Sequence, residues 1–334
     1  ARLEFQDGNN PLKYPPPILC LGDQKLQTEN LQLVVPRKNP DGTLTIPQGI
    51  KITDISKLTS NHSGAGNSVI SLGEKIHVVF PASKGPPKLK GTPQCIVTFD
   101  RRTGRLTKPI LLGMGMGDGD APDSHNIPAI SADNKGYLHV ILSAHNQPFQ
   151  YTHSLKPNST TDGWTVPKNI GYVKKGKNVL YQYSYVALIC DKKNTLHLVG
   201  RLRDENARAT LTYMRKKEGQ GWEKPRSLVV PFHTGYSGYY HRLNIDRKGR
   251  LFLSYSYIGN YLSLEAIAAY RSKWPREKVP PWKKQSQYQK GDFLHYYTKP
   301  HDPAMLMSDD GGDTWRLALT DDFTSALLQP NSEK

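Results

Sequence analysis

Hydrophobic and polar residues alternate along four segments of the chain, and the four segments share one layout. The segments are Ser68–Phe80, Pro128–Leu142, Val186–Val199 and Leu243–Tyr255. In each of them, an alternating stretch leads into a polar turn that contains Gly, Asn or Lys, and a second alternating stretch follows. Alternation with a period of two residues is typical of β-strands, so the pattern predicts four β-hairpins.

The four hairpins recur at a nearly constant spacing. Their central residues Ile76, Leu138, Leu196 and Leu251 lie 62, 58 and 55 residues apart. One hairpin in about 58 residues leaves room for two further strands, which gives a four-stranded antiparallel blade as the repeating unit. We therefore predict an all-β fold, a single β-propeller domain over residues 1–334. Its length suits about six blades, and the chain ends would complete a seventh.

A turn motif repeats along the same chain. Residues 308–315, SDDGGDTW, resemble the Asp box, S-x-D-x-G-x-T-W, which is a turn motif of β-propellers. Shorter versions occur at residues 161–164 and 218–222, and both end in Trp. We expect the Asp and Thr side chains to bond local backbone groups and the Trp side chains to pack between blades, so these residues have a structural role.

One stretch departs from the repeat. Residues 259–304 contain a candidate short helix, Leu262–Ser272, and a basic, aromatic run with Trp274 and Trp282. We interpret this stretch as an elaborated blade or a loop insertion. Either it is an ordinary solvated loop, or the two tryptophans and the neighbouring lysines grip a substrate.

Composition narrows the class of protein. Hydrophobic residues make up 37% of the 334 residues, and no apolar run approaches the ~20 residues that a transmembrane helix needs. Lys and Arg number 45 and Asp and Glu number 29, so the formal net charge is +16. This charge favours a polyanionic partner: nucleic acid, an anionic membrane or an acidic polysaccharide. No pattern of a nucleic-acid-binding module is present, so we expect neither a nucleic-acid partner nor a membrane span.

Cysteine usage says little about the compartment. Cys20, Cys95 and Cys190 lie far apart, without zinc-finger spacing, and allow at most one disulfide bond. The chain starts without Met and without an apolar leader, so a signal peptide would already have been removed. We expect a monomer that is secreted, bound to the cell surface or periplasmic.

Titratable and aromatic residues gather at one end of successive hairpins. His125 precedes the first strand of the second hairpin, and His145 follows its second strand. Tyr185 and Arg201 hold the corresponding places in the third hairpin. Because a hairpin brings the start of its first strand beside the end of its second, His125 should neighbour His145, and Tyr185 should neighbour Arg201. The same end of the third and fourth hairpins also carries Tyr183, Arg203, Tyr239, Tyr240 and His241.

Three other histidines recur at one position of the repeat. His77, His139 and His197 each stand in an (I/L)-H-(V/L) context within the second strand of a hairpin. A residue that is repeated from unit to unit serves the fold more often than the function. We therefore assign these three to structure, and we assign His125 and His145, which break the repeat, to the site.

The chain resembles a known enzyme family at these positions. The runs DSHNIP at 123–128 and SAHN at 143–146 look like those of BNR-repeat polysaccharide lyases that degrade ulvan, in family 25 and more distantly in family 24. The likeness extends over about residues 61–315, and it implies a seven-bladed propeller. The catalytic residues that it implies are His125, His145, Tyr185, Arg201 and Tyr240. Tyr183, Arg203 and Tyr239 are the alternatives to Tyr185, Arg201 and Tyr240. We expect these three, with Asn126, Asn146 and His241, to bind substrate.

The resemblance also implies a reaction. Ulvan, a polyanion of sulfated rhamnose and uronic acids, would be cleaved by β-elimination. This reaction removes the C5 proton of a uronate, expels the 4-linked sugar and leaves an unsaturated uronate. Arg201 would neutralise the uronate carboxylate with its planar guanidinium. Tyr185 would act as base or acid, and His125 and His145 would share the proton transfer or hold the carboxylate. Tyr240 would position the sugar ring.

The implied chemistry requires no cofactor. Members of the group can hold a structural metal ion, zinc or calcium, and the weak candidates for its ligands are His233 and His241. Asp118, Asp120 and Asp123 lie in a Gly-rich run that we interpret as a loop or a cation site.

Two other functions fit a propeller with these turn motifs. A sialidase-like glycoside hydrolase would need an arginine cluster and a Tyr/Glu pair, or two acids. Acidic residues are scarce at the hairpin ends that carry the histidines. A non-catalytic propeller that binds an anionic glycan would hold ulvan without cleaving it.

Overall fold

The structure is a computed structural model, and it describes most of the chain. The described residues are 2–5, 14–21, 29–56, 67–83, 90–116, 123, 125–171, 173–175, 178–180, 182–203, 209–230, 238–257, 261–263, 272, 293–295 and 302–327. Asp118, Asp120, His233, Trp274 and Trp282 lie outside these ranges.

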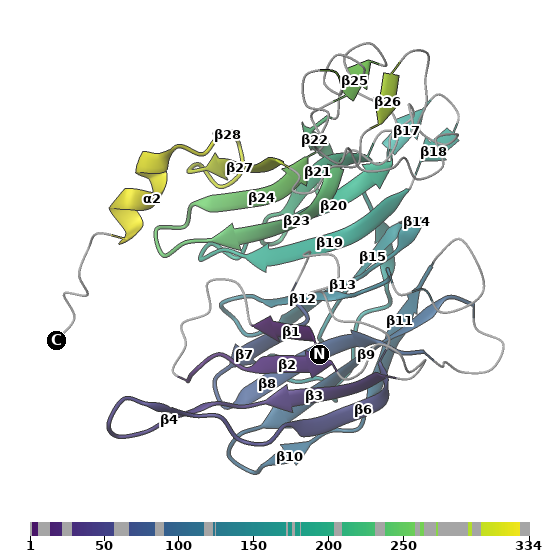
Figure 1. The fold of residues 1–334 in the computed structure, drawn as a ribbon. Coiled ribbons are helices and arrows are strands. Elements are labelled where there is room, and N and C mark those ends of the chain that lie inside the picture. Colours follow the sequence, from purple (N-terminus) through teal and green to yellow (C-terminus); the bar gives the residue numbers. More distant parts are fainter. Residues whose placement is uncertain are drawn as a thin grey trace.

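Five antiparallel sheets of four or five strands follow one another along the described chain (Figure 1). The first sheet comprises β1 (Arg2–Phe5), β2 (Ile18–Leu21), β3 (Glu29–Val34) and β6 (Ile50–Ser56). The second comprises β7 (Val69–Leu72), β8 (Lys75–Pro81), β9 (Thr92–Asp100), β10 (Arg105–Leu106) and β11 (Ile110–Gly115). The third comprises β12 (Ala129–Ala132), β13 (Leu138–Leu142), β15 (Phe149–His153) and β16 (Lys168–Ile170).

The other two large sheets lie mainly in the C-terminal half of the chain. The fourth sheet comprises β14 (His145–Gln147), β19 (Tyr183–Cys190), β20 (Leu196–Arg203), β21 (Ala209–Lys216) and β22 (Arg226–Val229). The fifth comprises β23 (Gly238–Ile245), β24 (Leu251–Tyr257), β27 (Asp302–Ser308) and β28 (Arg316–Leu317). Three two-stranded ribbons are formed by β4 (Arg37–Lys38) with β5 (Leu44–Thr45), β17 (Val173–Lys175) with β18 (Asn178–Leu180), and β25 (Tyr261–Ser263) with β26 (Phe293–His295). In Figure 1 the first sheet lies at the bottom and the fifth at the top.

The four predicted hairpins are confirmed as β7–β8, β12–β13, β19–β20 and β23–β24. Each of their turns contains one residue with a positive φ: Gly73 at 58°, Gly136 at 86°, Asn194 at 60° and Gly249 at 85°. Gly and Asn adopt this left-handed conformation at little cost, which is why the sequence places them in these turns. The all-β prediction is therefore confirmed, whereas the number of seven blades stays a prediction.

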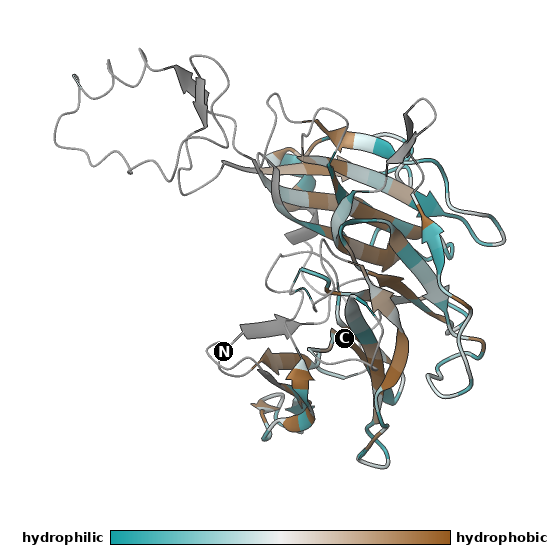
Figure 2. Cartoon of the chain, turned by 90° about the vertical axis from the view of Figure 1, so that its right-hand side faces the viewer, coloured by the Kyte–Doolittle hydropathy of each residue, from teal (hydrophilic) through white to brown (hydrophobic). Residues whose placement is uncertain are grey.

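Four hydrophobic clusters fill the spaces between successive sheets. Neighbouring residues of one strand point to opposite faces and so belong to different clusters. Val78 in β8 packs toward the first sheet, while Val79 packs toward the third. Leu198 in β20 packs toward the third sheet, while Val199 packs toward the fifth. Complete burial of such a side chain stabilises the fold by about 1.5–3 kcal/mol. Figure 2 shows the resulting hydrophobic bands along the strands.

Three tryptophans pack in equivalent places between sheets. Trp164, Trp222 and Trp315 each follow the third strand of a sheet and contact the cluster shared with the preceding sheet. The ring of Trp222 meets Tyr151 edge-on at 5.5 Å, and that of Trp315 meets Tyr213 at 5.3 Å. In the last of these turns the Asp310 carboxylate accepts hydrogen bonds from the Thr314 backbone and hydroxyl groups. These tryptophans therefore pack between sheets as expected.

The repeated histidines lie in the interior. His139 Nδ1 bonds the Tyr151 hydroxyl at 2.8 Å and its Nε2 bonds Asp133 at 3.2 Å. His197 makes the same two bonds with Tyr213 and Asp191, at 2.7 and 3.2 Å. The expectation that they serve the fold agrees with these bonds. His77 instead bonds Thr98 and Asn158, both at 2.8 Å.

The chain between β24 and β27 leaves the fifth sheet. Of this stretch, which overlaps the predicted insertion at 259–304, the structure describes the β25–β26 ribbon and residue 272. The first residues of the predicted helix Leu262–Ser272 belong instead to strand β25. A short helix, α2 (Thr320–Leu327), follows the last sheet. No helix among the described residues is long and apolar enough to cross a membrane, and all three cysteines are unpaired.

Candidate active site

The third and fourth sheets meet where the chain passes from one to the other. After β13 the chain enters the three-residue strand β14, which pairs with β19 of the next sheet. In this register His145 lies opposite Ser184. The His145 amide donates to Met116 O at 3.0 Å, and the Asn146 amide donates to Ser184 Oγ at 3.2 Å. The crossing strand therefore delivers His145 from the second hairpin to the start of the third.

Three β-bulges lie at this end of the sheets. The first is in β14, where Asn146 has a φ of 56°. The second is in β19 between Ser184 and Val186, and it contains Tyr185 with a φ of 57°. The third is in β23 between Gly238 and His241. A left-handed residue other than Gly costs about 1–3 kcal/mol, and bulges of this kind re-aim side chains beside active sites.

The two site histidines share one carboxylate. Asp123 Oδ1 lies 2.6 Å from His125 Nδ1, and Oδ2 lies 2.6 Å from His145 Nδ1. The His125 backbone amide also donates to Oδ1 at 2.8 Å. The two rings are stacked, with centroids 4.3 Å apart. Because Nδ1 donates to the carboxylate, Nε2 carries the lone pair in each neutral ring.

The shared carboxylate is strongly stabilised in its ionised form. Burial would raise the pKa of Asp123, but the hydrogen bonds from His125 and His145 outweigh it and hold the pKa far below its ordinary value. The side chains of His125 and His145 are 33% and 23% exposed. Both rings are therefore fixed by an anion and still reach the surface.

A tyrosine and an arginine complete the group. The Tyr185 ring lies 5.8 Å from the His125 ring, and the Arg201 guanidinium carbon lies 4.4 Å above the Tyr185 ring centre. Tyr240 meets Tyr185 edge-on at 5.5 Å. The predicted pairs His125–His145 and Tyr185–Arg201 are thus neighbours, and the two pairs touch each other. Tyr185 and Arg201 are buried, at 2% and 7% exposure, while Tyr240 is 36% exposed.

Three residues expected to bind substrate lie in the interior instead. Asn126 is fully buried, and its side-chain amide donates to Gly115 O at 2.9 Å. Tyr183 is fully buried, stacks on Phe149 and donates to Gly171 O at 2.7 Å. His241 is 1% exposed and bonds Val199 O at 3.1 Å, and burial lowers its pKa to about 4. These three side chains bond interior groups of the fold, and their assignment to substrate binding stays a prediction.

The other residues expected to bind substrate or metal lie beside this group or outside the described residues. Arg203 is exposed at the end of β20, and Asn146 is half-buried beside His145. The backbone of Tyr239 belongs to β23, while its side chain lies outside the described residues. His233, one of the two metal candidates, also lies outside them.

In the histidine group (Asp123, His125 and His145), the carboxylate and the Nδ1 atoms together do not have the spacing of a zinc site. Within the described part of the chain, the group with metal-ligand character is Asp123, His125 and His145. Tetrahedral zinc at 2.0–2.1 Å would hold its ligand atoms about 3.3 Å apart. Here each Nδ1 is 2.6 Å from a carboxylate oxygen, which is a hydrogen-bond distance. Calcium needs six or more oxygen ligands, and this group offers one carboxylate. His241 belongs to no such group among the described residues.

Asp123 belongs to the candidate site, although the sequence alone did not place it there. It was grouped with Asp118 and Asp120 as a loop or cation site, whereas it holds both histidines. A signal was available in the spacing: an Asp two residues before a His can accept the backbone amide of that His, as Asp123 does.

Comparisons with known proteins agree with this fold. Residues 99–329 match the model of a family described as BNR repeat-containing family members. No curated protein matches the chain. An ulvan lyase of polysaccharide lyase family 25 is similar over 77% of this chain and 57% of its own, with a TM-score of 0.51 and 14% identity. Such a lyase bound to a saccharide of glucuronate and sulfated rhamnose has the same coverage, a TM-score of 0.50 and 13% identity.

A sialidase is also similar. The Hadza microbial sialidase Hz136 matches 88% of this chain and 55% of its own, with a TM-score of 0.44 and 11% identity.

These matches differ in what they establish. At 13–14% identity, the two lyase structures show a similarity of fold alone. This chain spans 57% of their length. The family model covers more than half of the chain, from the end of β9 to the C-terminal region. On this match, the chain belongs to the BNR repeat-containing family.

Proposed function

We propose that this chain is a polysaccharide lyase that cleaves ulvan by β-elimination. The observation that carries the proposal is the contact of a guanidinium, a phenol and two imidazoles in one group. Arg201 lies over Tyr185, Tyr185 lies against His125, and His125 is stacked on His145. The likeness of the fold to ulvan lyases and the net charge of +16 support a uronate-containing polyanion as substrate.

Arg201 is proposed to bind the uronate carboxylate. The negative charge of that carboxylate opposes formation of a carbanion at C5, and a guanidinium neutralises it with paired, planar donors. Arg201 is 7% exposed, so solvent screens its charge less than it screens a surface arginine.

Tyr185, His125 and His145 are proposed to transfer the protons. A base takes the proton from C5, the electron pair forms the C4–C5 double bond, the C4–O bond breaks, and an acid protonates the departing oxygen. The two imidazoles are more exposed than Tyr185 and Arg201, so the polymer can reach them directly. Asp123 holds Nδ1 of each ring and thereby presents Nε2 as the nitrogen for proton transfer.

Tyr240 is proposed to position the sugar ring. It is the most exposed aromatic residue of the group and stands edge-on to Tyr185. The amphipathic ring of a tyrosine can pack against a sugar face while its hydroxyl bonds the sugar. Arg203 and Asn146, which flank the group, are proposed as further polymer contacts.

The whole protein is proposed to be a secreted monomer that needs no cofactor and has the form of a seven-bladed propeller. A polymer as large as ulvan meets enzymes outside the cell, which favours this location. The five sheets described here would be successive blades.

A measurement of product distinguishes the proposed lyase from other propeller proteins. The purified chain is incubated with ulvan, alginate, heparin and pectin while the ultraviolet absorbance of unsaturated uronate is followed. We expect a rise with ulvan. New reducing ends without absorbance would mean a glycoside hydrolase, and binding without either product would mean a glycan-binding protein; each result would reject the proposal.

A further inference from the structure

The hairpin turns at the other end of the sheets are basic. The turn between β12 and β13 contains Lys135, that between β19 and β20 contains Lys192 and Lys193, and that between β23 and β24 contains Arg247 and Lys248. All five side chains are exposed. We call this set the basic turn ridge. We propose that it is a second binding surface for the anionic polysaccharide, separate from the histidine group; this inference rests on the proposed function.

The ridge lies far from the histidine group. Tyr185 stands near the start of β19, and the turn follows the end of that strand at Cys190. At about 3.3 Å per residue, six residues of strand place roughly 20 Å between Tyr185 and the turn. Strands β19 and β23 run toward the left side of Figure 1, and their turns lie together on that side.

The three turns are joined into one continuous surface. The Asn134 backbone amide donates to Asn194 Oδ1 at 2.8 Å, and its side-chain amide donates to Lys192 O at 2.7 Å. Lys192 Nζ donates to Arg247 O at 3.1 Å. Turns of the third, fourth and fifth sheets are therefore held in a row, and a linear polymer can contact them in succession.

The acidic residues of the turns, Asp133, Asp191 and Asp246, are largely buried. Asp133 and Asp191 accept hydrogen bonds from backbone amides of their own turns and from the interior histidines His139 and His197. Asp246 bonds Arg250 at 2.7 Å. These carboxylates bond groups of their own turns, so the exposed side chains of the ridge are the basic ones.

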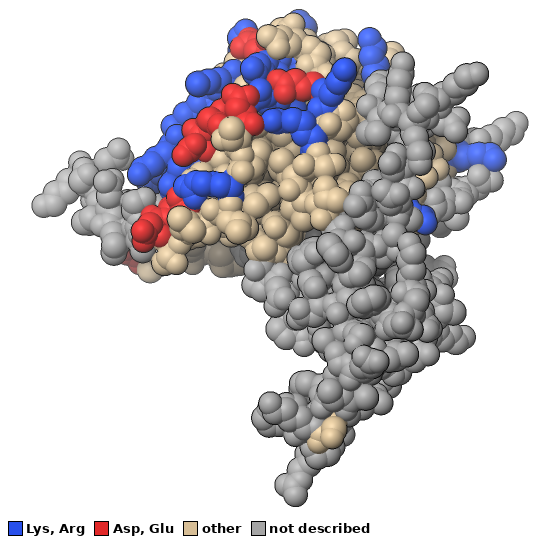
Figure 3. Space-filling view, turned by 90° about the horizontal axis from the view of Figure 1, so that it is seen from above, with Lys and Arg blue, Asp and Glu red and all other residues tan. Residues whose placement is uncertain are grey.

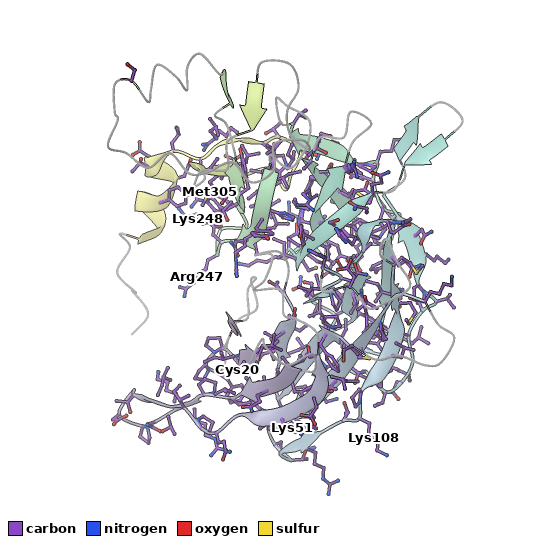
Figure 4. All side chains as sticks on the ribbon, turned by 45° about the vertical axis from the view of Figure 1, so that its right-hand side comes forward. Cys20, Lys51, Lys108, Arg247, Lys248 and Met305 are labelled. Atoms are coloured by element: carbon purple, nitrogen blue, oxygen red, sulfur yellow. The ribbon has the colours of Figure 1, made fainter. Side chains whose placement is uncertain are left out.

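One ridge cation is paired. Lys135 forms an ion pair with Glu218, which also accepts a hydrogen bond from Asn194. Among the described residues, no ion pair involves the other four ridge cations. Figure 3 shows Lys and Arg side chains gathered over the C-terminal sheets, with acidic ones among them, and Figure 4 shows Arg247 and Lys248 on the turn.

Repeated cations on one row of turns suit a polymer that carries a charge on successive sugars. Each contact is weak because solvent and salt screen it, but several contacts on one polymer add up. The ridge would hold the polysaccharide near the enzyme between cleavage events. Its affinity should therefore depend on polymer length and on salt concentration.

The test compares two variants of equal charge. The ridge variant combines Lys192→Gln, Lys193→Gln, Arg247→Gln and Lys248→Gln. The control variant combines Lys38→Gln, Lys108→Gln, Lys168→Gln and Lys224→Gln, all at exposed positions outside the ridge turns. Electrophoresis in native gels that contain ulvan measures the apparent Kd of each protein without any need for turnover.

We expect the apparent Kd for ulvan to rise about tenfold in the ridge variant at low salt, and less than about twofold in the control. Equal losses in both variants, or no loss in either, would overturn the proposal, as would a ridge that binds duplex DNA more tightly than ulvan. The absorbance assay on the wild-type protein decides the lyase proposal separately, so ulvan binding without cleavage would reject the lyase and leave the ridge standing.

Discussion

The molecule uses Asp–His pairs in two regions, which differ in burial and in the ring nitrogen that bonds the aspartate. In the interior, each of His139 and His197 bonds an aspartate through Nε2 and a tyrosine hydroxyl through Nδ1, so both nitrogens are satisfied within the fold. In the candidate site, one aspartate takes Nδ1 of both rings, and the rings are partly exposed. The same two residue types therefore make a structural bond in one place and, under the proposed function, a reactive pair in the other.

The tyrosines follow the same division. Tyr151 and Tyr213 close the interior networks, and burial raises the pKa of each above its ordinary value. Tyr185 lies beneath a guanidinium in a left-handed bulge. Of these three tyrosines, Tyr185 is the one with a strained backbone, and it is also the one that the proposed lyase chemistry would use.

The largest expected effect comes from removing a proton-transfer group of the site. Tyr185→Phe and His125→Ala should each lower kcat for ulvan cleavage about 10²–10⁴-fold, the usual contribution of general acid–base catalysis. Product absorbance measures the loss, and circular dichroism confirms that the variants fold. Tyr151→Phe is the matched control from the interior. Near-wild-type activity of both site variants would remove them from the mechanism.

The next effect concerns the shared carboxylate. Asp123→Asn should lower kcat/KM about 10–100-fold, because an amide cannot accept a hydrogen bond from two imidazoles at its two ends. The absorbance assay at several ulvan concentrations measures this loss.

The interior counterpart provides the control for this change. Asp133→Asn should lower the free energy of unfolding and leave kcat/KM where it is, because Asp133 bonds His139 and its own turn. If Asp123→Asn cleaves ulvan with the wild-type kcat/KM, Asp123 does not position the histidines.

The comparison also explains what could be predicted from the sequence. Alternation and turn residues located all four hairpins, and hairpin geometry placed His125 beside His145 and Tyr185 beside Arg201. The burial of Tyr183 was missed, since Tyr183 and Tyr185 are two residues apart and would share one face of a regular strand. The bulge between Ser184 and Val186 separates them and sends Tyr183 into the core. Bulges leave little trace in a hydrophobic pattern.

As the pH is lowered, the buried histidines should reduce the stability of the fold before Asp123 becomes protonated. Burial lowers the pKa of His77 and His241 to about 4, so between pH 6.5 and 4 the unfolded chain binds protons that the folded chain does not. As the pH decreases over this interval, the free energy of unfolding should decrease by up to about 1.4 kcal/mol per pH unit for each such histidine.

Urea unfolding at pH 6 and pH 5 measures this slope. Asp123 contributes nothing to it, since a carboxylate with a lowered pKa loses its stabilising effect only below its unfolded pKa of about 3.9. A free energy of unfolding that stays constant over the interval would mean that the buried histidines are already protonated.

The smallest expected effect separates the two classes of tyrosine most directly. Tyr213→Phe removes the hydroxyl that bonds fully buried His197, and it should lower the free energy of unfolding by about 1–2 kcal/mol because the ring nitrogen loses its partner. Since Tyr213 lies between the fourth and fifth sheets, kcat for ulvan should be unchanged. Urea unfolding and the absorbance assay on the same preparation give both numbers. A loss of activity without a loss of stability would mean that the interior network reaches the site, and the division between structural and reactive histidines would not hold.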